Sequence, residues 1–162
     1  QLSPWFSRYL QTRNMHFHHS GHTDDAPLAN EILGIHKGTS KTLPLVPILH
    51  YPKLFTPIDI GIVPLSNIPF NHAKSFIKGL EYAAAGVPFI SSYSPEYQYL
   101  ADHGIGRIAH TQEDWVYHLD ELRISSTRKD EIENNLEVLK NFTVEKRGED
   151  WNTVMKYIKD KI

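Results

Sequence analysis

The sequence predicts an α/β protein, with a Rossmann-like parallel sheet flanked by helices. Short apolar runs alternate along the chain with helical segments of about ten residues, as expected for βαβ units. The sharpest run, Ile58–Leu65, is almost continuously apolar, which is typical of a parallel strand covered on both faces. With 162 residues, 40% of them apolar and 22% charged, the chain fits one soluble globular domain.

The first third of the chain carries weaker signals than the rest. Apolar residues at helical spacing predict a short helix over Pro4–Gln11, and alternating side chains predict a strand over Met15–His19. The pattern over Asp24–Lys41 indicates loops with one short helix. Two prolines interrupt Leu43–His50, so any strand there is short or lies at a sheet edge.

The middle of the chain gives a strand, a helix and a second strand. The Ile58–Leu65 strand is followed by a polar turn, and then by a helix from about Ser75 to Ala85. Gly86 is a typical residue for the position just after a helix. Val87–Ser91 is predicted to be a second buried strand.

The last third alternates in the same way and ends in helices. Glu96–His103 is predicted to be a helix that ends at Gly104, and Gly106–Ala109 a short strand. Three amphipathic helices are expected to follow, over 113–122, 127–141 and 144–162. In the last of them, we expect core or domain-interface anchors at Trp151, Tyr157 and Ile158.

The amino-acid composition indicates which classes of partner and which cellular compartment to expect. Lys and Arg number 17 against 19 Asp and Glu, so no cationic excess is available for nucleic acid, and we expect no nucleic-acid partner. The absence of cysteine excludes disulfides and thiolate zinc sites and allows a reducing compartment; we expect a cytoplasmic protein. No apolar run is long enough for a bilayer, and no signal peptide is recognised. Because the chain begins at Gln1, we expect a fragment.

The loop after the Ile58–Leu65 strand is the first candidate site, since ligands of such sheets bind beyond the carboxyl ends of the strands. The following helix is expected to begin with Lys74 and Ser75, where free N–H groups suit a phosphate. Lys78 lies four positions after Lys74 on the same predicted face, and Glu81 follows on that side.

Three motifs in this region resemble one enzyme family. They are Asp59-Ile-Gly-Ile-Val-Pro-Leu, Phe70-Asn-x-Ala-Lys-Ser, and Lys78-x-Leu-Glu81-Tyr-Ala-Ala-x-Gly-Val-Pro88. Together they resemble the donor-binding core of retaining GT-B glycosyltransferases of family 4, also called group 1. The resemblance implies the C-terminal half of a GT-B fold. It also implies a parent enzyme that transfers a sugar from a nucleoside-diphosphate donor to an acceptor hydroxyl without a metal or other cofactor.

The resemblance also implies roles for individual residues. Glu81 matches the second Glu of the family's Glu-x7-Glu motif, which holds the ribose hydroxyls. The first Glu of that motif falls at Ala73, so this sequence departs from the pattern there. Lys74 and Ser75 are placed near the diphosphate or the donor sugar. Lys78 and Asn71 complete the donor-binding set, although Asn71 is also a common turn former; no catalytic residue is assigned.

The resemblance further implies partners outside this chain. The donor would be a UDP- or GDP-sugar, and the acceptor a glycan or lipid bound by a missing N-terminal domain. The first strand and an Arg–Lys pair for the diphosphate are expected upstream of Gln1, so the isolated fragment should be inactive. Peripheral membrane association of the full-length protein is compatible with such an acceptor. The alternative is a non-catalytic interaction or regulatory domain that keeps the fold, which Ala73 favours.

A histidine cluster, formed by His16, His18, His19 and His22, allows a second interpretation. Imidazole is a common metal ligand, and His16 and His18 would share one face of a strand. The favoured interpretation is a strand end with exposed histidines, because no carboxylate joins the run before Asp24 and Asp25. Asp59, at the start of a predicted buried strand, is expected to cap or salt-link its neighbours.

Overall fold

The computed structural model describes residue 2 and residues 4–20 and 29–160. Its strands are β1 (Phe17–His19), β2 (Ser40–Thr42), β3 (Gly61–Val63), β4 (Phe89–Ser92) and β5 (Arg107–Ala109). Within the described residues they form two sheets, β1-β2 and β3-β4-β5, and every strand pair is parallel. The predicted α/β class with parallel strands flanked by helices is therefore confirmed, although the strands form two sheets instead of one.

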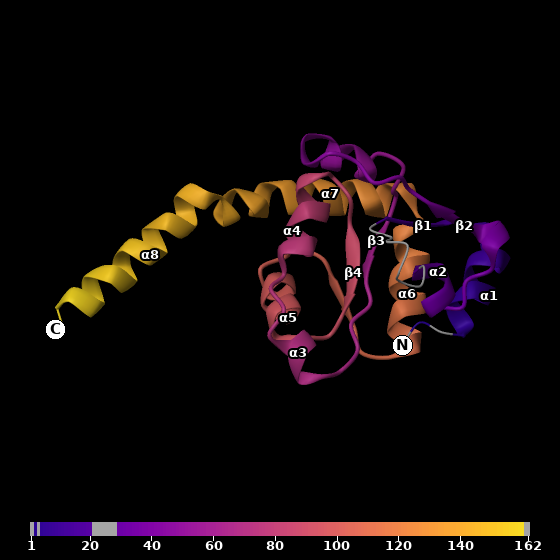
Figure 1. Ribbon diagram of the computed structural model, residues 1–162, viewed down its shortest axis with the longest axis horizontal. Helices are drawn as coiled ribbons and strands as arrows, with labels where there is room; N and C mark the ends of the chain where they lie inside the picture. The colour runs from indigo at the N-terminus through magenta and orange to yellow at the C-terminus, as the bar shows by residue number, and fades with distance from the viewer. Residues whose placement is uncertain (1, 3, 21–28, 161–162) are drawn as a thin grey trace.

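Helices cover the strands on both sides (Figure 1). They are α1 (Trp5–Thr12), α2 (Ala29–Ile32), α3 (Pro69–His72), α4 (Ile77–Ala84), α5 (Pro95–Asp102), α6 (Gln112–Leu122), α7 (Ser125–Leu139) and α8 (Val144–Lys159). Over the described residues they are accompanied by the 3-10 helices η1 (Lys37–Thr39), η2 (Ile48–Phe55) and η3 (Lys140–Phe142). Most of the predicted helices are thus present, with ends that differ by a few residues.

Two hydrophobic cores lie on opposite faces of β4. Phe89 and Ile90 are neighbours on that strand, only 1% and 0% exposed, and their side chains point to opposite faces. Ile90 belongs to the core that α1 and α6 build, and Phe89 to the core that includes α4 and α5. A strand covered on both faces explains why two successive residues of β4, Phe89 and Ile90, are both large and apolar.

Local sequence signals set several helix ends. Gly86 and Gly104 have φ angles of +70° and +88°, a backbone conformation that glycine adopts at little cost after a helix. Thr111 begins α6 with a capping box, in which its hydroxyl accepts from the Asp114 N–H and the Asp114 carboxylate accepts from the Thr111 N–H. These ends lie within one residue of the predicted ones.

Two segments differ from the strand pattern in the sequence: a strand was predicted over 58–65, and over 43–50 any strand was expected to be short or at a sheet edge. The 58–65 run forms only the three residues of β3, and Asp59 lies before it with its side chain 82% exposed, 3.8 Å from Arg128 Nη2. The expected salt link of Asp59 is therefore present, but the residue is not buried. The 43–50 segment forms no strand, because β2 ends at Thr42 and η2 begins at Ile48; its prolines explain this.

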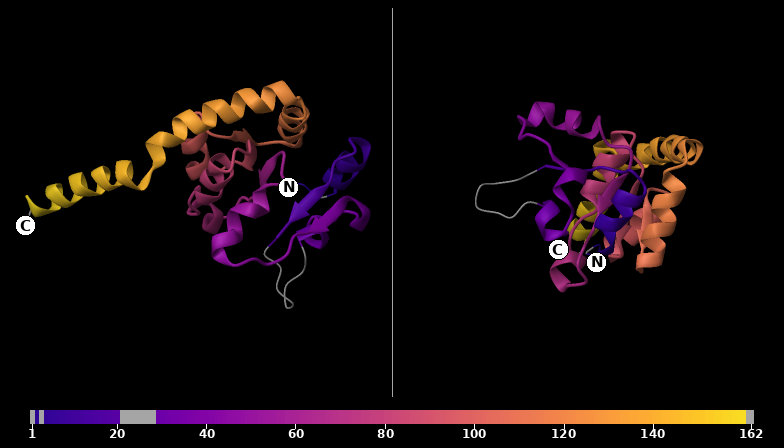
Figure 2. Two further views of the ribbon diagram at one scale, coloured as in Figure 1. Left: turned by 90° about the horizontal axis from the view of Figure 1, so that it is seen from above. Right: turned by 90° about the vertical axis from the view of Figure 1, so that its right-hand side faces the viewer.

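Helix α8 leaves the body of the molecule and extends beyond α7 (Figures 1 and 2). Trp151, Tyr157 and Ile158 are 69%, 62% and 44% exposed on it, so the expectation that they are core anchors is wrong. The reason is geometric: η3 separates α7 from α8 and directs α8 away from the sheets. Whether they anchor a domain interface stays a prediction. No helix in the described part of the chain has both the length and the apolar character to cross a membrane.

Candidate functional site

A cavity of about 460 Å³ runs along β1 and β3 and reaches the carboxyl ends of β1, β2 and β3. Ser20, Leu43 and Pro64, each of which directly follows one of these strands, line it together with residues of η2 and α4. Most of the lining is apolar, and the polar side chains include His18, Tyr51 and Lys78. Ligands of parallel α/β sheets bind at this end of the strands, in concave sites of this size.

Lys78 and Glu81 form an ion pair beside this cavity, one turn apart on α4. The Tyr51 hydroxyl, from η2, donates a hydrogen bond of 2.9 Å to Glu81 Oε2. Lys78 Nζ contacts both partners, Tyr51 and Glu81, and lies 5.1 Å from the centre of the Tyr51 ring. The predicted position of Glu81 on the same side as Lys78 is therefore correct.

The electrostatics of this cluster keep Lys78 charged. Burial works against the ammonium form, but the hydrogen bonds to Glu81 and Tyr51 outweigh it and raise the pKa of Lys78. The Lys78 side chain is 44% exposed and that of Glu81 32% exposed, so water screens the pair and its contribution to stability is small. Both groups can thus change partners without a large loss of stability.

The start of α4 differs from the prediction. The helix begins at Ile77 rather than at Ser75, and Lys74 and Ser75 lie in the turn before it. The short helix α3, which Pro69 begins at a position that favours proline, takes up the preceding residues. The chain then needs a turn before α4, so the predicted shared helix face of Lys74 and Lys78 is wrong. Lys74 is exposed, and its Nζ lies 5.7 Å from the Phe70 ring centre.

Asn71 stabilises the loop after β3. Its Nδ2 donates a hydrogen bond of 2.8 Å to the Ser66 carbonyl, while the His72 ring lies 2.7 Å from Asn67 Oδ1. The interpretation of Asn71 as a turn former therefore has direct support. Of the five predicted site residues, Lys78 lines the cavity, whereas Glu81, Asn71, Lys74 and Ser75 do not. The structure brings together Lys78 and Glu81 out of the five predicted site residues.

The sequence did not point to Tyr51. This residue stands in a proline-containing apolar segment without a motif, and its contact with Glu81 spans 30 positions of sequence. Only the packing of η2 against α4, where the rings of Phe55 and Tyr82 lie 5.4 Å apart, brings it to the site. No local pattern could have predicted this contact.

The histidine cluster is more buried than expected. His19 is 8% exposed, stacks on Phe17 at 5.7 Å and lies 3.2 Å from Thr42 Oγ1, so the expectation of an exposed strand end is wrong for it. Desolvation, aided by Lys41 and His16, lowers the pKa of His18. Among the described residues, no group of three or more His, Asp or Glu could hold a metal ion. His22, Asp24 and Asp25 lie outside the described residues.

Comparison with known proteins finds no match to this chain. A scan against protein-family models, a search of curated proteins and a search of solved structures each find no match. The class that the fold and the site define is a parallel α/β protein with a cavity that reaches the carboxyl ends of its strands. A fold of this class serves many functions, so the residues of the site determine which one this protein has.

Proposed function

We propose that this chain is the donor-binding domain of a glycosyltransferase, and that it holds a nucleoside-diphosphate sugar in the cavity that reaches the carboxyl ends of β1, β2 and β3. The observation that carries the proposal is the Lys78–Glu81 pair beside that cavity. A carboxylate and an ammonium group match the two polar parts of such a donor, the ribose hydroxyls and the diphosphate. The motif resemblance over Ile58–Ser92 supports the same assignment.

Donor binding would exchange the partners of both charged groups. Glu81 would release Lys78 and Tyr51 and accept hydrogen bonds from the two vicinal ribose hydroxyls, which are charge-assisted. Lys78 would turn to the diphosphate and stabilise the negative charge that grows on the leaving group during sugar transfer. The apolar lining, with Tyr51 and Tyr82, suits the flat faces of a base.

Calorimetric titration with UDP and GDP tests the proposal in the full-length protein. We expect one nucleotide to bind, and Glu81→Gln to weaken it at least about tenfold, since a charged acceptor is lost. Glu137→Gln is the matched control: Glu137 also pairs with a lysine three positions away, Lys140, but is 73% exposed on α7. Nucleotide binding that Glu81→Gln leaves unchanged would place the ligand elsewhere and overturn the proposal.

A second candidate is a non-catalytic interaction domain that keeps the same fold. Two observations favour it: Ala73 stands where the resembling family has its first Glu, and Glu81 is already satisfied by Lys78 and Tyr51. A full-length protein that binds neither UDP nor GDP would make this candidate the better one.

A further inference from the structure

Helix α8 carries an apolar stripe that faces solvent. The stripe is formed by Val144, Gly148, Trp151, Met155 and Ile158, at alternating intervals of four and three positions, which keep residues on one side of a helix. Its four apolar side chains are between 44% and 84% exposed, and residues 149–160 are all exposed. Because exposed apolar surface is unfavourable in water, a helix with such a stripe is expected to bury it against another surface.

Only the first turn of α8 is fixed to the body of the molecule. Arg147 Nη2 donates to the Tyr99 hydroxyl on α5 at 3.3 Å, and the Arg147 guanidinium lies 4.7 Å from the centre of the Phe142 ring in η3. The Thr143 hydroxyl accepts from the Lys146 N–H and caps the helix. Beyond this turn, α8 extends away from the sheets (Figures 1 and 2). The body therefore holds the stripe in place without covering it.

The charges beside the stripe match a second copy of the same helix. Glu145 and Lys159 lie on one flank, two heptads apart, with Asn152 midway between them. When two α8 helices pair antiparallel, Glu145 of each copy lies beside Lys159 of the other, and the two Asn152 side chains face each other. In a parallel pair, Lys159 would face Val154 and Asn152 would face Arg147, so these positions would bring no opposite charges together. Flanking charges set the orientation of paired helices, and here they favour the antiparallel one.

We propose that α8 is a dimerisation helix, which pairs antiparallel with α8 of a second copy of this chain about a two-fold axis near Thr153. In this register, Trp151 packs against Met155 of the second copy, a favourable contact of an aromatic ring with a thioether. Gly148 faces Ile158 of the second copy, and no described atom lies within 4 Å of its Cβ position, so there is room for that side chain. By symmetry, each contact occurs twice. The inference does not depend on the proposed function.

The flanking charges cannot satisfy each other within one chain. Two heptads of an α-helix span about 21 Å, so Glu145 and Lys159 of the same α8 are far beyond the reach of an ion pair. A second copy in the antiparallel orientation satisfies both charges at once. This self-complementarity is the reason to assign the stripe to a second copy of the chain.

Sedimentation equilibrium of residues 1–162, over about 1 to 300 µM protein, tests the proposal. We expect a reversible monomer–dimer equilibrium, because two short helices make a small interface and such interfaces are weak. Trp151→Ala should raise the dimer dissociation constant at least about tenfold, since a central tryptophan carries much of the energy of an interface. Tyr157→Ala is the matched control and should change the constant less than about threefold, because Tyr157 is 62% exposed on α8 but lies off the stripe.

A charge exchange tests the antiparallel orientation. At low salt, Glu145→Lys alone and Lys159→Glu alone should each weaken the dimer at least about tenfold, because like charges would meet twice. An equimolar mixture of the two variants should return to within about threefold of the wild-type dissociation constant, because both flanking contacts become attractive again. Circular dichroism of each variant checks that α8 stays helical, since both changes also act on the ends of the helix dipole.

Four results would overturn the inference. A chain that stays monomeric over the whole range would show that the stripe does not pair with itself. Dimers that Trp151→Ala leaves unchanged would lie elsewhere on the molecule, and a mixture that fails to recover would exclude the antiparallel orientation. A monomer that co-sediments with vesicles of phosphatidylserine and phosphatidylcholine would assign the stripe to a lipid surface. All these measurements are made without nucleotide, so their failure is distinguishable from failure of the proposed function.

Discussion

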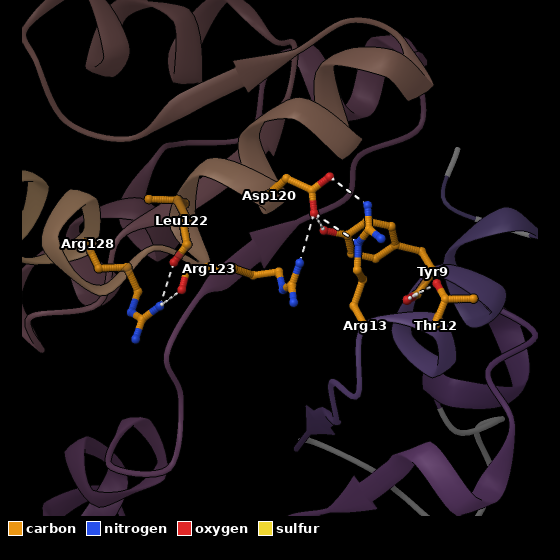
Figure 3. A network of polar contacts seen from close by, with 7 residues as sticks. All are labelled: Tyr9, Thr12, Arg13, Asp120, Leu122, Arg123 and Arg128. Carbon is orange, nitrogen blue, oxygen red and sulfur yellow. Dashed lines mark hydrogen bonds and ion pairs between the residues drawn. The ribbon is translucent and has the colours of Figure 1, made fainter.

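The hydroxyl of Tyr9 lies 2.8 Å from Asp120 Oδ1, and this contact joins α1 to α6 across 111 positions of sequence. Arg13 donates to both oxygens of the same carboxylate, through Nε and Nη2 at 3.1 Å each, and Arg123 donates at 3.2 Å (Figure 3). A two-oxygen contact with an arginine fixes the geometry of the carboxylate. Asp120 is therefore a polar attachment point between α1 and α6.

Replacing Asp120 with asparagine should weaken this attachment. An amide keeps the size of the side chain but loses the negative charge of the carboxylate, to which Arg13, Arg123 and Tyr9 donate hydrogen bonds. Since the Asp120 side chain is 35% exposed and screened, we expect a loss of only about 1 kcal/mol in the free energy of unfolding, measured with urea. Asp150→Asn is the control: Asp150 pairs with Arg147 but is 67% exposed on α8, and its loss should be under about 0.5 kcal/mol. Equal effects of the two changes would contradict the prediction.

The same carboxylate should make stability depend on acidity. The hydrogen bond from Arg13 above all, with those from Tyr9 and Arg123, holds the pKa of Asp120 below its ordinary value of 3.8, although burial opposes this. A carboxylate with a lowered folded-state pKa stabilises the protein above pH 3.8, and this contribution is lost as the pH falls through the folded-state pKa. The stability difference between wild type and Asp120→Asn should therefore shrink in acid. A difference that stays constant would exclude this linkage.

Tyr9 should produce the opposite dependence in alkali. Burial, followed by the hydrogen bond to Asp120, raises the pKa of Tyr9 from 10.0 to about 12. A group with a raised folded-state pKa contributes its full stability below pH 10, and this contribution is lost as the pH rises toward 12. Below pH 10 we expect Tyr9→Phe to cost about 1 kcal/mol, and between pH 10 and 12 we expect that cost to disappear. Urea midpoints across this range measure it; parallel curves for the two proteins would refute it.

Much of the fold could be predicted from the sequence because local signals determine it. The apolar run at 58–65 indicated a buried parallel strand, and Gly86 and Gly104 marked helix ends that have positive φ in the structure. The start of α4 was predicted two residues too early, because Pro69 begins the short helix α3 and a turn must follow it. A hydrophobic pattern does not determine which of several neighbouring residues begins a helix, so it could not predict this shift.

The candidate site was predicted less completely. The i,i+3 spacing of Lys78 and Glu81 is a property of one helix, so their pairing could be anticipated. The contact of Tyr51 with Glu81, and the burial of His19 against Phe17 and Thr42, depend on how distant segments pack. Such contacts have no periodic signature in the sequence.

Gly106 should be essential to the core, while Gly148 should not. Gly106 has a φ of +79°, and a Cβ there would lie 2.2 Å from Cζ of Phe89, a ring that is 1% exposed. We expect Gly106→Ala to destabilise the protein by about 2–4 kcal/mol, through both backbone strain and overpacking. Gly148 is in α8 with nothing within 4 Å of its Cβ position, so Gly148→Ala should stabilise by up to about 1 kcal/mol. Thermal unfolding of both variants measures this contrast, and a tolerated Gly106→Ala would contradict the packing around Phe89.

Tyr51 distinguishes a donor site from a purely structural cluster. Its hydroxyl donates a hydrogen bond to Glu81 Oε2. In the proposed function, the same carboxylate accepts hydrogen bonds from the ribose hydroxyls. Tyr51→Phe keeps the ring but removes this competing donor, so nucleotide affinity should tighten by about two- to tenfold, the worth of one released hydrogen bond. The free energy of unfolding without ligand should fall by about 1 kcal/mol for the same reason. Calorimetry and urea unfolding of one variant provide both quantities. Reduced affinity together with reduced stability would mean that Tyr51 contacts the nucleotide itself. If neither the wild type nor the variant binds a nucleotide and only stability falls, the contacts among Tyr51, Lys78 and Glu81 serve only the packing of η2 on α4.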